Sequence, residues 1–228
     1  MSQTRLGVVD YTPFQKGCQM GTAHYERPAI NLIEENVTPF DVALYIGGRE
    51  GTADLPLLKK HGISIVVNCA VNLDLNYVLT EEPSHIDAPV PYGHGALRYY
   101  KIGLVDGAGS PASMMLAGYY ILRGALVQEM PDRPSYPHRE RGNILVNCRG
   151  GRSRSTALVS LFLHKSMPNT YPTMEAALAH VRERRELRPD EWHETPKQVL
   201  VDAIKQASDW IDMIGHDDVP RYDGKGTE

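Results

Sequence analysis

A cysteine and an arginine separated by five residues, Cys148 and Arg154, are the pair in this chain best suited to phosphoryl chemistry. Two glycines between them, Gly150 and Gly151, let the backbone turn several N–H groups toward one point as an anion nest. An arginine guanidinium can hold two phosphate oxygens and stabilise the charge spread over them. The segment is therefore predicted to bind a phosphoryl group, with Cys148 as nucleophile and Arg154 as its main cationic ligand.

The flanking elements are predicted to put the cysteine at an anion-binding position. Residues 143–147 are an apolar run that predicts a strand, and residues 156–165 are apolar at helical spacing. Cys148 then lies at a helix N-terminus, where unpaired amides and the helix dipole favour negative charge. A free thiol with a pKa of about 8.5 can fall to roughly 3.5–7.5 there, beside arginines. If Cys148 were only a small core residue, Arg152 and Arg154 would oppose the dipole with no anion to meet.

The remaining apolar runs predict an α/β fold with a mostly parallel central sheet flanked by helices. Strands are predicted at 42–46, 63–68, 98–102 and 143–147, and helices at 53–61, 110–130, 156–165 and from Thr195–Pro196 onward. Ser110 is the predicted N-cap of the second helix, with Pro111 at its first position. Residues 72–97 and 131–142 are predicted to be long surface loops, and the mixed-charge run 182–188 is typical of a solvated helix face.

The chain is predicted to hold one domain between two less regular ends. Its 228 residues suffice for one α/β domain with a core. Glycines and prolines interrupt any periodicity over residues 1–40, which are predicted to form an irregular arm. The charged residues 215–228 are predicted to be a mobile polar tail, which leaves 41–214 as the domain.

With its flanks, the segment around Cys148 resembles the dual-specificity type of cysteine-dependent phosphatase. The family signature is His-Cys-x5-Arg-Ser/Thr; Cys148, Arg154 and Ser155 match it, whereas Asn147 replaces the histidine. Further similarity lies in residues 43–48, 54–63, 65–68, 173–177, 184–189 and 198, which together span most of 41–212. The resemblance implies that 41–214 is a phosphatase domain. Asparagine can still hydrogen-bond and hold the loop, but it cannot carry charge.

The resemblance also implies roles for the side chains of the loop. The hydroxyl of Ser155 would stabilise the departing thiolate when a phosphocysteine is hydrolysed, although a serine in a first helical turn is also an ordinary cap. The residues implied to bind the substrate phosphate along with Arg154 are Arg149, Gly150, Gly151, Arg152 and Ser153. The side chains of Arg149 and Arg152 can equally be interpreted as exposed loop residues.

The chemistry needs a carboxylic acid to protonate the leaving oxygen, and Asp106 is the candidate. It follows the strand predicted to end at residue 102, which is where the family carries its general acid, and nearby glycines would let its loop move. An Asp-Gly pair is also a common turn signal without catalytic meaning. Asp132, in the 131–142 segment, and Asp190, in a turn before the last helix, are rival acids.

These residues predict a metal-independent phosphomonoester hydrolase that acts through a phosphocysteine, most simply a dual-specificity or tyrosine protein phosphatase. Its partner would be a phosphorylated protein or a small phosphoester. Two alternatives stay open: a phosphatase of a non-protein phosphoester such as a phosphoinositide or inositol phosphate, and a phosphate-binding pseudophosphatase, which Asn147 favours. A rhodanese-like sulfurtransferase is disfavoured, because its shorter loop would place the arginine where this chain has Ser153.

Composition argues against other classes of function. A formal net charge of −4 gives no support to nucleic acid binding. The chain shows no signal segment and no apolar run of membrane-spanning length, so a cytoplasmic protein without membrane insertion is expected. Its nine histidines include no His-x-x-x-His or His-Glu-x-x-His pair, so neither a metal site nor a cofactor is expected.

A second cysteine is predicted to lie near the first. Cys69 follows residues 66–68 as Cys148 follows residues 145–147, and parallel strands end at the same edge of a sheet. Cys69 is therefore a candidate redox partner that could capture an oxidised Cys148 as a disulfide. The alternative is a buried, inert thiol. Three cysteines, an odd count with no close-spaced pair, argue against a disulfide-stapled secreted fold.

Overall fold

The computed structural model of the chain describes residues 27–81 and 91–215. Its main sheet has five strands in the order β1-β2-β7-β3-β6, with a separate two-stranded sheet of β4 and β5. The main strands are β1 (Ile30–Val37), β2 (Val42–Gly47), β3 (Ile63–Ala70), β6 (Arg98–Leu104) and β7 (Asn143–Asn147). All neighbours pair in parallel except β1, which runs antiparallel to β2. The predicted α/β class with a mostly parallel sheet is confirmed.

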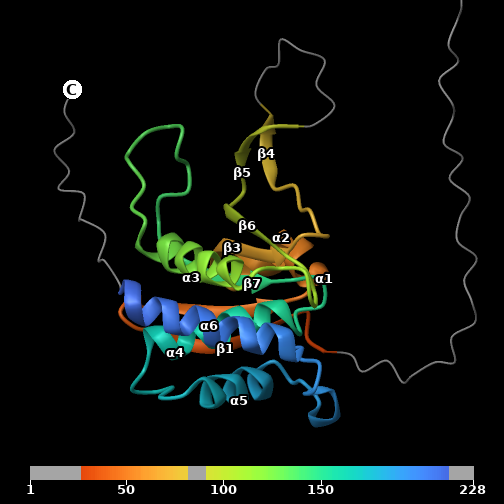
Figure 1. Cartoon of the computed structure of the whole chain (residues 1–228). Coiled ribbons are helices and arrows are strands. Elements are labelled where there is room, and N and C mark those ends of the chain that lie inside the picture. The colour runs from red at the N-terminus through yellow and green to blue at the C-terminus, as the bar shows by residue number, and fades with distance from the viewer. Residues whose placement is uncertain (1–26, 82–90, 216–228) are drawn as a thin grey trace, which may run out of the picture.

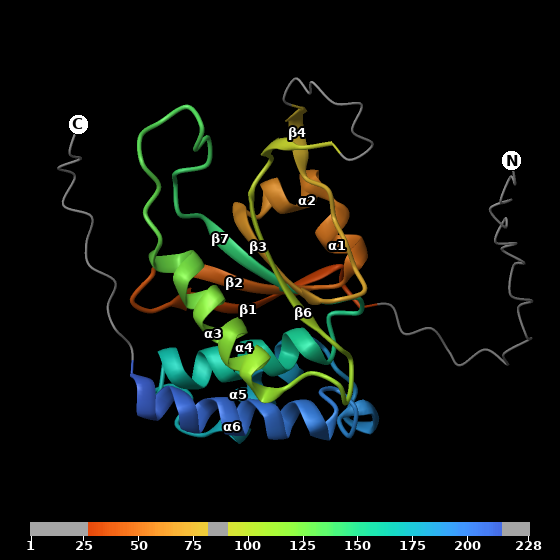
Figure 2. The same cartoon turned by 45° about the horizontal axis from the view of Figure 1, so that its top comes forward.

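Helices cover both faces of the main sheet, as Figures 1 and 2 show. The short α1 (Arg49–Ala53) and α2 (Leu55–Lys60) lie on one face. The larger core on the other face is covered by α3 (Ala112–Val127), α4 (Arg154–Ser166), α5 (Met174–Arg184) and α6 (Gln198–Ile214), with a 3-10 turn at Pro189–Glu191. Because apolar residues are buried on both sides, the central strands read as continuous apolar runs rather than alternating ones.

The centre of the molecule is α4, which positions the loop that contains Cys148. Its residues from Arg154 to Leu163 are all buried between the sheet and the neighbouring helices. Large apolar side chains such as Leu158, Leu161 and Phe162 each contribute about 1.5–3 kcal/mol by leaving water. The helix N-terminus is thus fixed against the ends of β7 and β3.

The predicted irregular arm is wrong for residues 30–37, which form strand β1. Its buried Ile30, Ile33 and Val37 pack on the sheet, but they do not alternate at a period of two residues. The reason is that the pairing with β2 shifts register between Leu32 and Glu34 and again before Val37, as in a β-bulge. Residues 1–26 of the predicted arm, and residues 216–228 of the predicted tail, lie outside the described residues.

Other boundaries also differ from the predictions. The predicted helix at 53–61 is α2, which begins only at Leu55, because Asp54 separates it from α1 and caps it by accepting a hydrogen bond from the amide of Leu57 (2.9 Å). Ser110 does not cap α3; its hydroxyl accepts from the amide of Val105 (2.9 Å), and Pro111 occupies the cap position. The predicted loop 72–97 contains the strands β4 (Val78–Glu81) and β5 (Gly93–Gly95). Within the described ranges, no helix has both the length and the apolar character needed to cross a bilayer.

Candidate active site

The loop between β7 and α4 lies at the C-terminal edge of the sheet, against the end of β2. In the paired strands Asn147 lies beside both Gly47 and Asn68, so Cys148 follows at the middle of this edge. Gly151 has φ +62°, and a Cβ there would come within 2.5 Å of the carbonyl oxygen of Gly47. Only glycine fits this close approach, so the loop conformation is built into the sequence.

The geometry around Cys148 favours a thiolate. The side chain is 2% exposed, and its Sγ lies 3.4 Å from the hydroxyl oxygen of Ser155. Burial acts to raise the pKa of Cys148, but hydrogen bonds from the hydroxyl and amide of Ser155, the charge of Arg154 and the amide of Arg152 outweigh it and lower the pKa. The position of Ser155 beside the sulfur therefore fits its predicted contact with the thiolate.

The side chain of Arg154 is held by two acceptors, one in the segment after β3 and one at the end of β6. It is 2% exposed, and its Nη1 donates to Oδ1 of Asn72 (3.0 Å) and to the carbonyl of Leu104 (3.1 Å). Among the residues that the structure describes, no partner accepts from its buried Nε. The role of Asn72 was not predicted; its only sequence signal is that it lies two residues after the end of a buried strand.

The pocket above this loop is strongly cationic. Its volume is about 820 Å³, and Cys148 and Arg154 both line it. The other cationic lining residues are Arg27, Arg49, Arg149, Arg152, Arg185 and Lys197, against the acidic Glu50, Asp106 and Glu194. A chain with a net charge of −4 thus concentrates positive charge at one cleft, which attracts anions. In the ranges 27–81 and 91–215, no three His, Cys, Asp or Glu side chains gather as metal ligands.

The structure brings Asp106 to this pocket and leaves its two rivals elsewhere. Asp106 is exposed in the segment after β6 and lines the pocket with Cys148, while its backbone carbonyl accepts a hydrogen bond from Nζ of Lys197 (3.0 Å). Asp132 pairs with Arg139, and Asp190 pairs with Arg188, whose hydrogen bond lowers the pKa of that carboxyl group. Neither of the two rivals lines the pocket.

Arg185 was missed by the sequence analysis, which treated residues 182–188 as a solvated helix face. The side chain is 2% exposed, and its Nε donates to the carbonyl of Gly151 (2.9 Å) while Nη1 donates to that of Pro28 (2.9 Å). Burial, with the neighbouring charge of Arg27, lowers the pKa of Arg185 to about 10. Arg185 lies four residues after the buried Val181, so it falls on the same face of the helix as the apolar residues of α5. This spacing was the sequence signal that could have indicated its burial.

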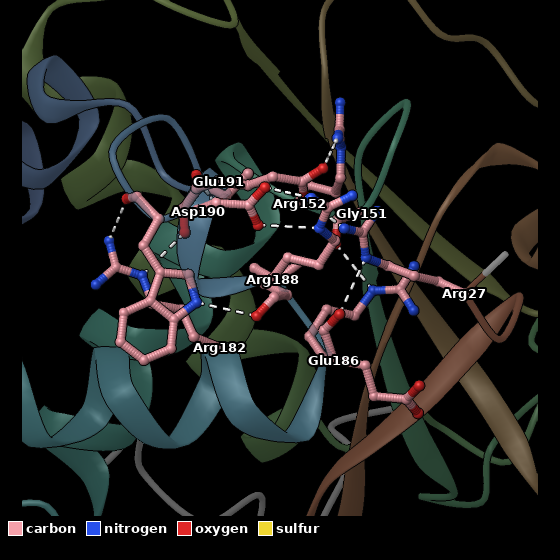
Figure 3. A network of polar contacts seen from close by, with 12 residues as sticks. Arg27, Gly151, Arg152, Arg182, Glu186, Arg188, Asp190 and Glu191 are labelled. Carbon is pink, nitrogen blue, oxygen red and sulfur yellow. Dashed lines mark hydrogen bonds and ion pairs between the residues drawn. The ribbon is translucent and has the colours of Figure 1, made fainter. Parts of the chain in front are cut away.

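A network of polar contacts extends this wall of the pocket to the turn before α6 (Figure 3). Glu191 pairs with Arg27 and, at 3.6 Å, with Arg152. Nε of Arg27 also donates to the carbonyl of Glu186 (3.1 Å). The residues just before β1 and the segment after α5 are therefore joined to the loop around Gly151, far apart though they are in sequence.

Two buried residues, Asn147 and Cys69, lie on neighbouring strands behind the loop. The side chain of Asn147 could hold the loop by hydrogen bonds, but neither of its amide atoms has a hydrogen-bond partner in the described part of the chain. Cys69 is fully buried and directly follows Asn68, the strand neighbour of Asn147. Burial, and then the charge of Cys148, raise the pKa of Cys69 well above its ordinary value, although Arg154 opposes them. The two cysteines are present as free thiols on adjacent strand ends.

No family model matches the chain, but solved structures do. The phosphatase domain of Yvh1 from Chaetomium thermophilum matches with a TM-score of 0.54 at 18% sequence identity, covering 81% of this chain and 96% of that chain. A mouse putative dual specificity phosphatase complexed with zinc tungstate gives 0.52 at 18% identity, covering 86% and 96%. The human tyrosine phosphatase-like serine/threonine/tyrosine-interacting protein gives 0.51 at 20% identity, covering 81% and 97%. The chain thus has the fold of the dual-specificity phosphatases.

Proposed function

We propose that the protein is a phosphomonoester hydrolase that acts through a phosphocysteine, as a dual-specificity or tyrosine protein phosphatase, without a metal ion. One observation carries the proposal: a cysteine of lowered pKa and a buried arginine with an unpartnered Nε share the floor of a cationic pocket. A thiolate is the nucleophilic form of cysteine, and the arginine fork suits the equatorial oxygens of a phosphoryl group. The fold supports the same proposal.

In the first step, the Cys148 thiolate attacks phosphorus and the ester P–O bond breaks. Asp106, protonated at the start, gives its proton to the leaving alkoxide or phenolate. Arg154 and the amides of the loop stabilise the charge on the phosphoryl oxygens, which is largest in the transition state. The products are a phosphocysteine, a free alcohol or phenol, and an Asp106 carboxylate.

In the second step, that carboxylate takes a proton from water as the water oxygen attacks phosphorus. The P–S bond breaks, and inorganic phosphate leaves. The Ser155 hydroxyl, 3.4 Å from Sγ, donates to the departing thiolate and lowers the energy of the leaving group. Asp106 is again protonated, so the cycle closes without a cofactor.

The test is to trap the covalent intermediate. Acid quenching during turnover of an aryl phosphate, followed by peptide mapping, should give phosphate attached to Cys148. The matched control is Cys69→Ser, which keeps the nucleophile and should still be labelled. Phosphate binding without label or turnover would instead establish a phosphate-binding pseudophosphatase.

Substrate choice needs a separate comparison, made without added metal. Turnover of a phosphotyrosine peptide, a phosphoserine peptide and an inositol phosphate should be measured side by side. We expect the peptides to be the better substrates. A preference for inositol phosphate, which the many cationic residues of the pocket could bind, would make the enzyme a phosphatase of non-protein esters.

A further inference from the structure

The buried Arg185, which directly follows α5, joins segments that are distant in sequence. Its Nε donates to the carbonyl of Gly151, in the loop after Cys148 (2.9 Å). Its Nη1 donates to the carbonyl of Pro28 (2.9 Å) and to Oδ1 of Asn31 on β1. Figure 3 shows Gly151 in this part of the molecule. One guanidinium therefore connects the candidate active-site loop to the start of the sheet.

The position of the guanidinium is itself supported. Nδ2 of Asn31 donates to Oε1 of Glu186 (2.9 Å), so the Asn31 amide is bonded through its oxygen to Arg185 and through its nitrogen to Glu186. Glu186 has φ +56°, a backbone conformation that turns the chain at the end of α5 and that residues other than glycine seldom adopt. Arg185 thus cannot leave the loop without also breaking its contacts to β1.

The hydrogen bond to Gly151 acts on the amide of the next residue. The peptide between Gly151 and Arg152 is trans, so its C=O and N–H point in opposite directions. A donor that holds the Gly151 carbonyl on one side therefore turns the Arg152 amide to the other side. There this amide donates to Cys148, and the bond is one of those that lower the pKa of the thiol. The charge of Arg185 also polarises the peptide, which makes its N–H a stronger donor.

Arg185 is charged over the pH range in which an activated thiol titrates, because its pKa is about 10. Burial lowers this pKa, whereas the charge of Cys148 raises it, so the two groups interact electrostatically. The same interaction favours the thiolate over the thiol. Besides the cationic wall of the pocket, the groups that face Cys148 from other elements are Arg154 on α4, Cys69 on β3 and Asp106 after β6.

We propose that Arg185 is a positioning residue for the nucleophile: by holding the Gly151 carbonyl, it aims the Arg152 amide at the sulfur of Cys148. The inference rests on the proposed function, in which Cys148 attacks phosphorus. The alternative is a purely structural role, since a cation at the C-terminal end of a helix is favourable in itself. The reactivity of Cys148 distinguishes the two, because a structural role changes the stability of the fold but not that of the thiolate.

The test is the pH dependence of alkylation by iodoacetamide. In Arg185→Met, which removes every donor, Cys148 should require a pH about one unit higher than in the wild type, because the Arg152 amide and a nearby charge no longer favour the thiolate. Arg185→Lys keeps the charge without the fork and should recover part of the shift. Arg184→Met is the matched control. This exposed neighbour donates to the carbonyl of Leu32 (3.3 Å), outside the pocket lining, and its loss should leave the profile unchanged.

Steady-state kinetics add a second readout. Arg185→Met should lower kcat/KM about tenfold for aryl and alkyl phosphates alike, since the nucleophile is affected and the proton donor is not. This pattern differs from that expected of Asp106→Asn, whose effect depends on the leaving group. Alkylation does not require turnover. A chain that shows the predicted alkylation shift but hydrolyses no phosphoester would therefore contradict the proposed function and support the role of Arg185.

If Arg185→Met does not fold, the wild-type chain supplies the test. In a pH titration followed by NMR, the amide proton of Arg152 and Hε of Arg185 should both shift at the pH at which Cys148 ionises. In Cys148→Ser, neither should shift there. An Arg185→Met alkylation profile equal to that of the wild type, or a wild-type titration that moves neither proton, would overturn the proposal.

Discussion

The loop that holds Cys148 and the segment that holds Asp106 face the same pocket but are built in opposite ways. In the first, Cys148, Ser153, Arg154 and Ser155 are all buried, and the conformation is fixed by the close approach of Gly151 to β2. The segment around Asp106 is exposed. It is held by a hydrogen bond from the amide of Val105 to the Ser110 hydroxyl and by another from Nζ of Lys197 to the carbonyl of Asp106. The residues proposed to bind phosphate thus belong to the core, whereas the proposed proton donor lies on a surface segment.

The largest loss of activity is expected from substitutions in the buried loop. Cys148→Ser should lower turnover by at least about 10⁴-fold, because the nucleophile is lost, while phosphate esters still bind. Arg154→Lys should lower both binding and turnover, by about 10²–10³-fold in kcat/KM, since a lysine cannot reproduce the fork. Steady-state kinetics measure turnover, and titration with inorganic phosphate measures binding. Appreciable turnover by Cys148→Ser would contradict the mechanism.

At the surface segment the effect should depend on the substrate. Asp106→Asn should slow alkyl phosphates by about 10²-fold and aryl phosphates with good leaving groups much less, because only poor leaving groups need the proton. Asp190→Asn serves as control, since Asp190 lies outside the pocket lining and should change neither. An equal loss for both substrate types would mean that Asp106 supports structure rather than proton transfer.

A smaller effect is expected from Cys69, which lies behind the buried loop. Peroxide should oxidise the Cys148 thiolate to a sulfenic acid, and the Cys69 thiol should then displace water to form a disulfide. The wild-type enzyme should recover with reductant, and Cys69→Ser severalfold less completely, because further oxidation of Cys148 is irreversible. Peptide mapping under non-reducing conditions identifies the crosslink. Full recovery of Cys69→Ser would show that Cys69 only packs.

The smallest predicted effect concerns the pH at which Cys148 reacts. Ser155→Ala removes a hydrogen bond that lowers the pKa of the thiol, so its alkylation by iodoacetamide should require higher pH. Asn147→His should shift it the other way, because an imidazolium favours the thiolate. Because folding lowers this pKa, the group contributes stability at alkaline pH that is lost as pH falls through the folded value. If the pH dependence of alkylation is unchanged in both variants, the pKa of Cys148 is set by the helix N-terminus and the arginines alone.

The sequence was sufficient where secondary structure and burial are encoded locally. The strands at residues 63–68 and 143–147 were predicted because both faces of the sheet are covered, and the Cys148 loop because its glycines and arginines are contiguous. Arg185 and Asn72 were missed, since their roles arise from contacts with backbone or side chains distant in sequence. Strand β1 was missed because its bulged pairing breaks the alternation that marks a strand. What sequence cannot convey here is which distant segments meet.

The burial of α4 also determines how the amides of the protein exchange with solvent deuterium. Since Arg154 to Leu163 are all enclosed, the amides from Ala157 onward, which are hydrogen-bonded within the helix, should open only with the whole domain and be among the slowest to exchange. Amides of the exposed residues around Asp106 should exchange through local openings that leave the core intact. The N-terminal end of α4 would then keep its shape for as long as the domain stays folded, even where the segment around Asp106 opens locally.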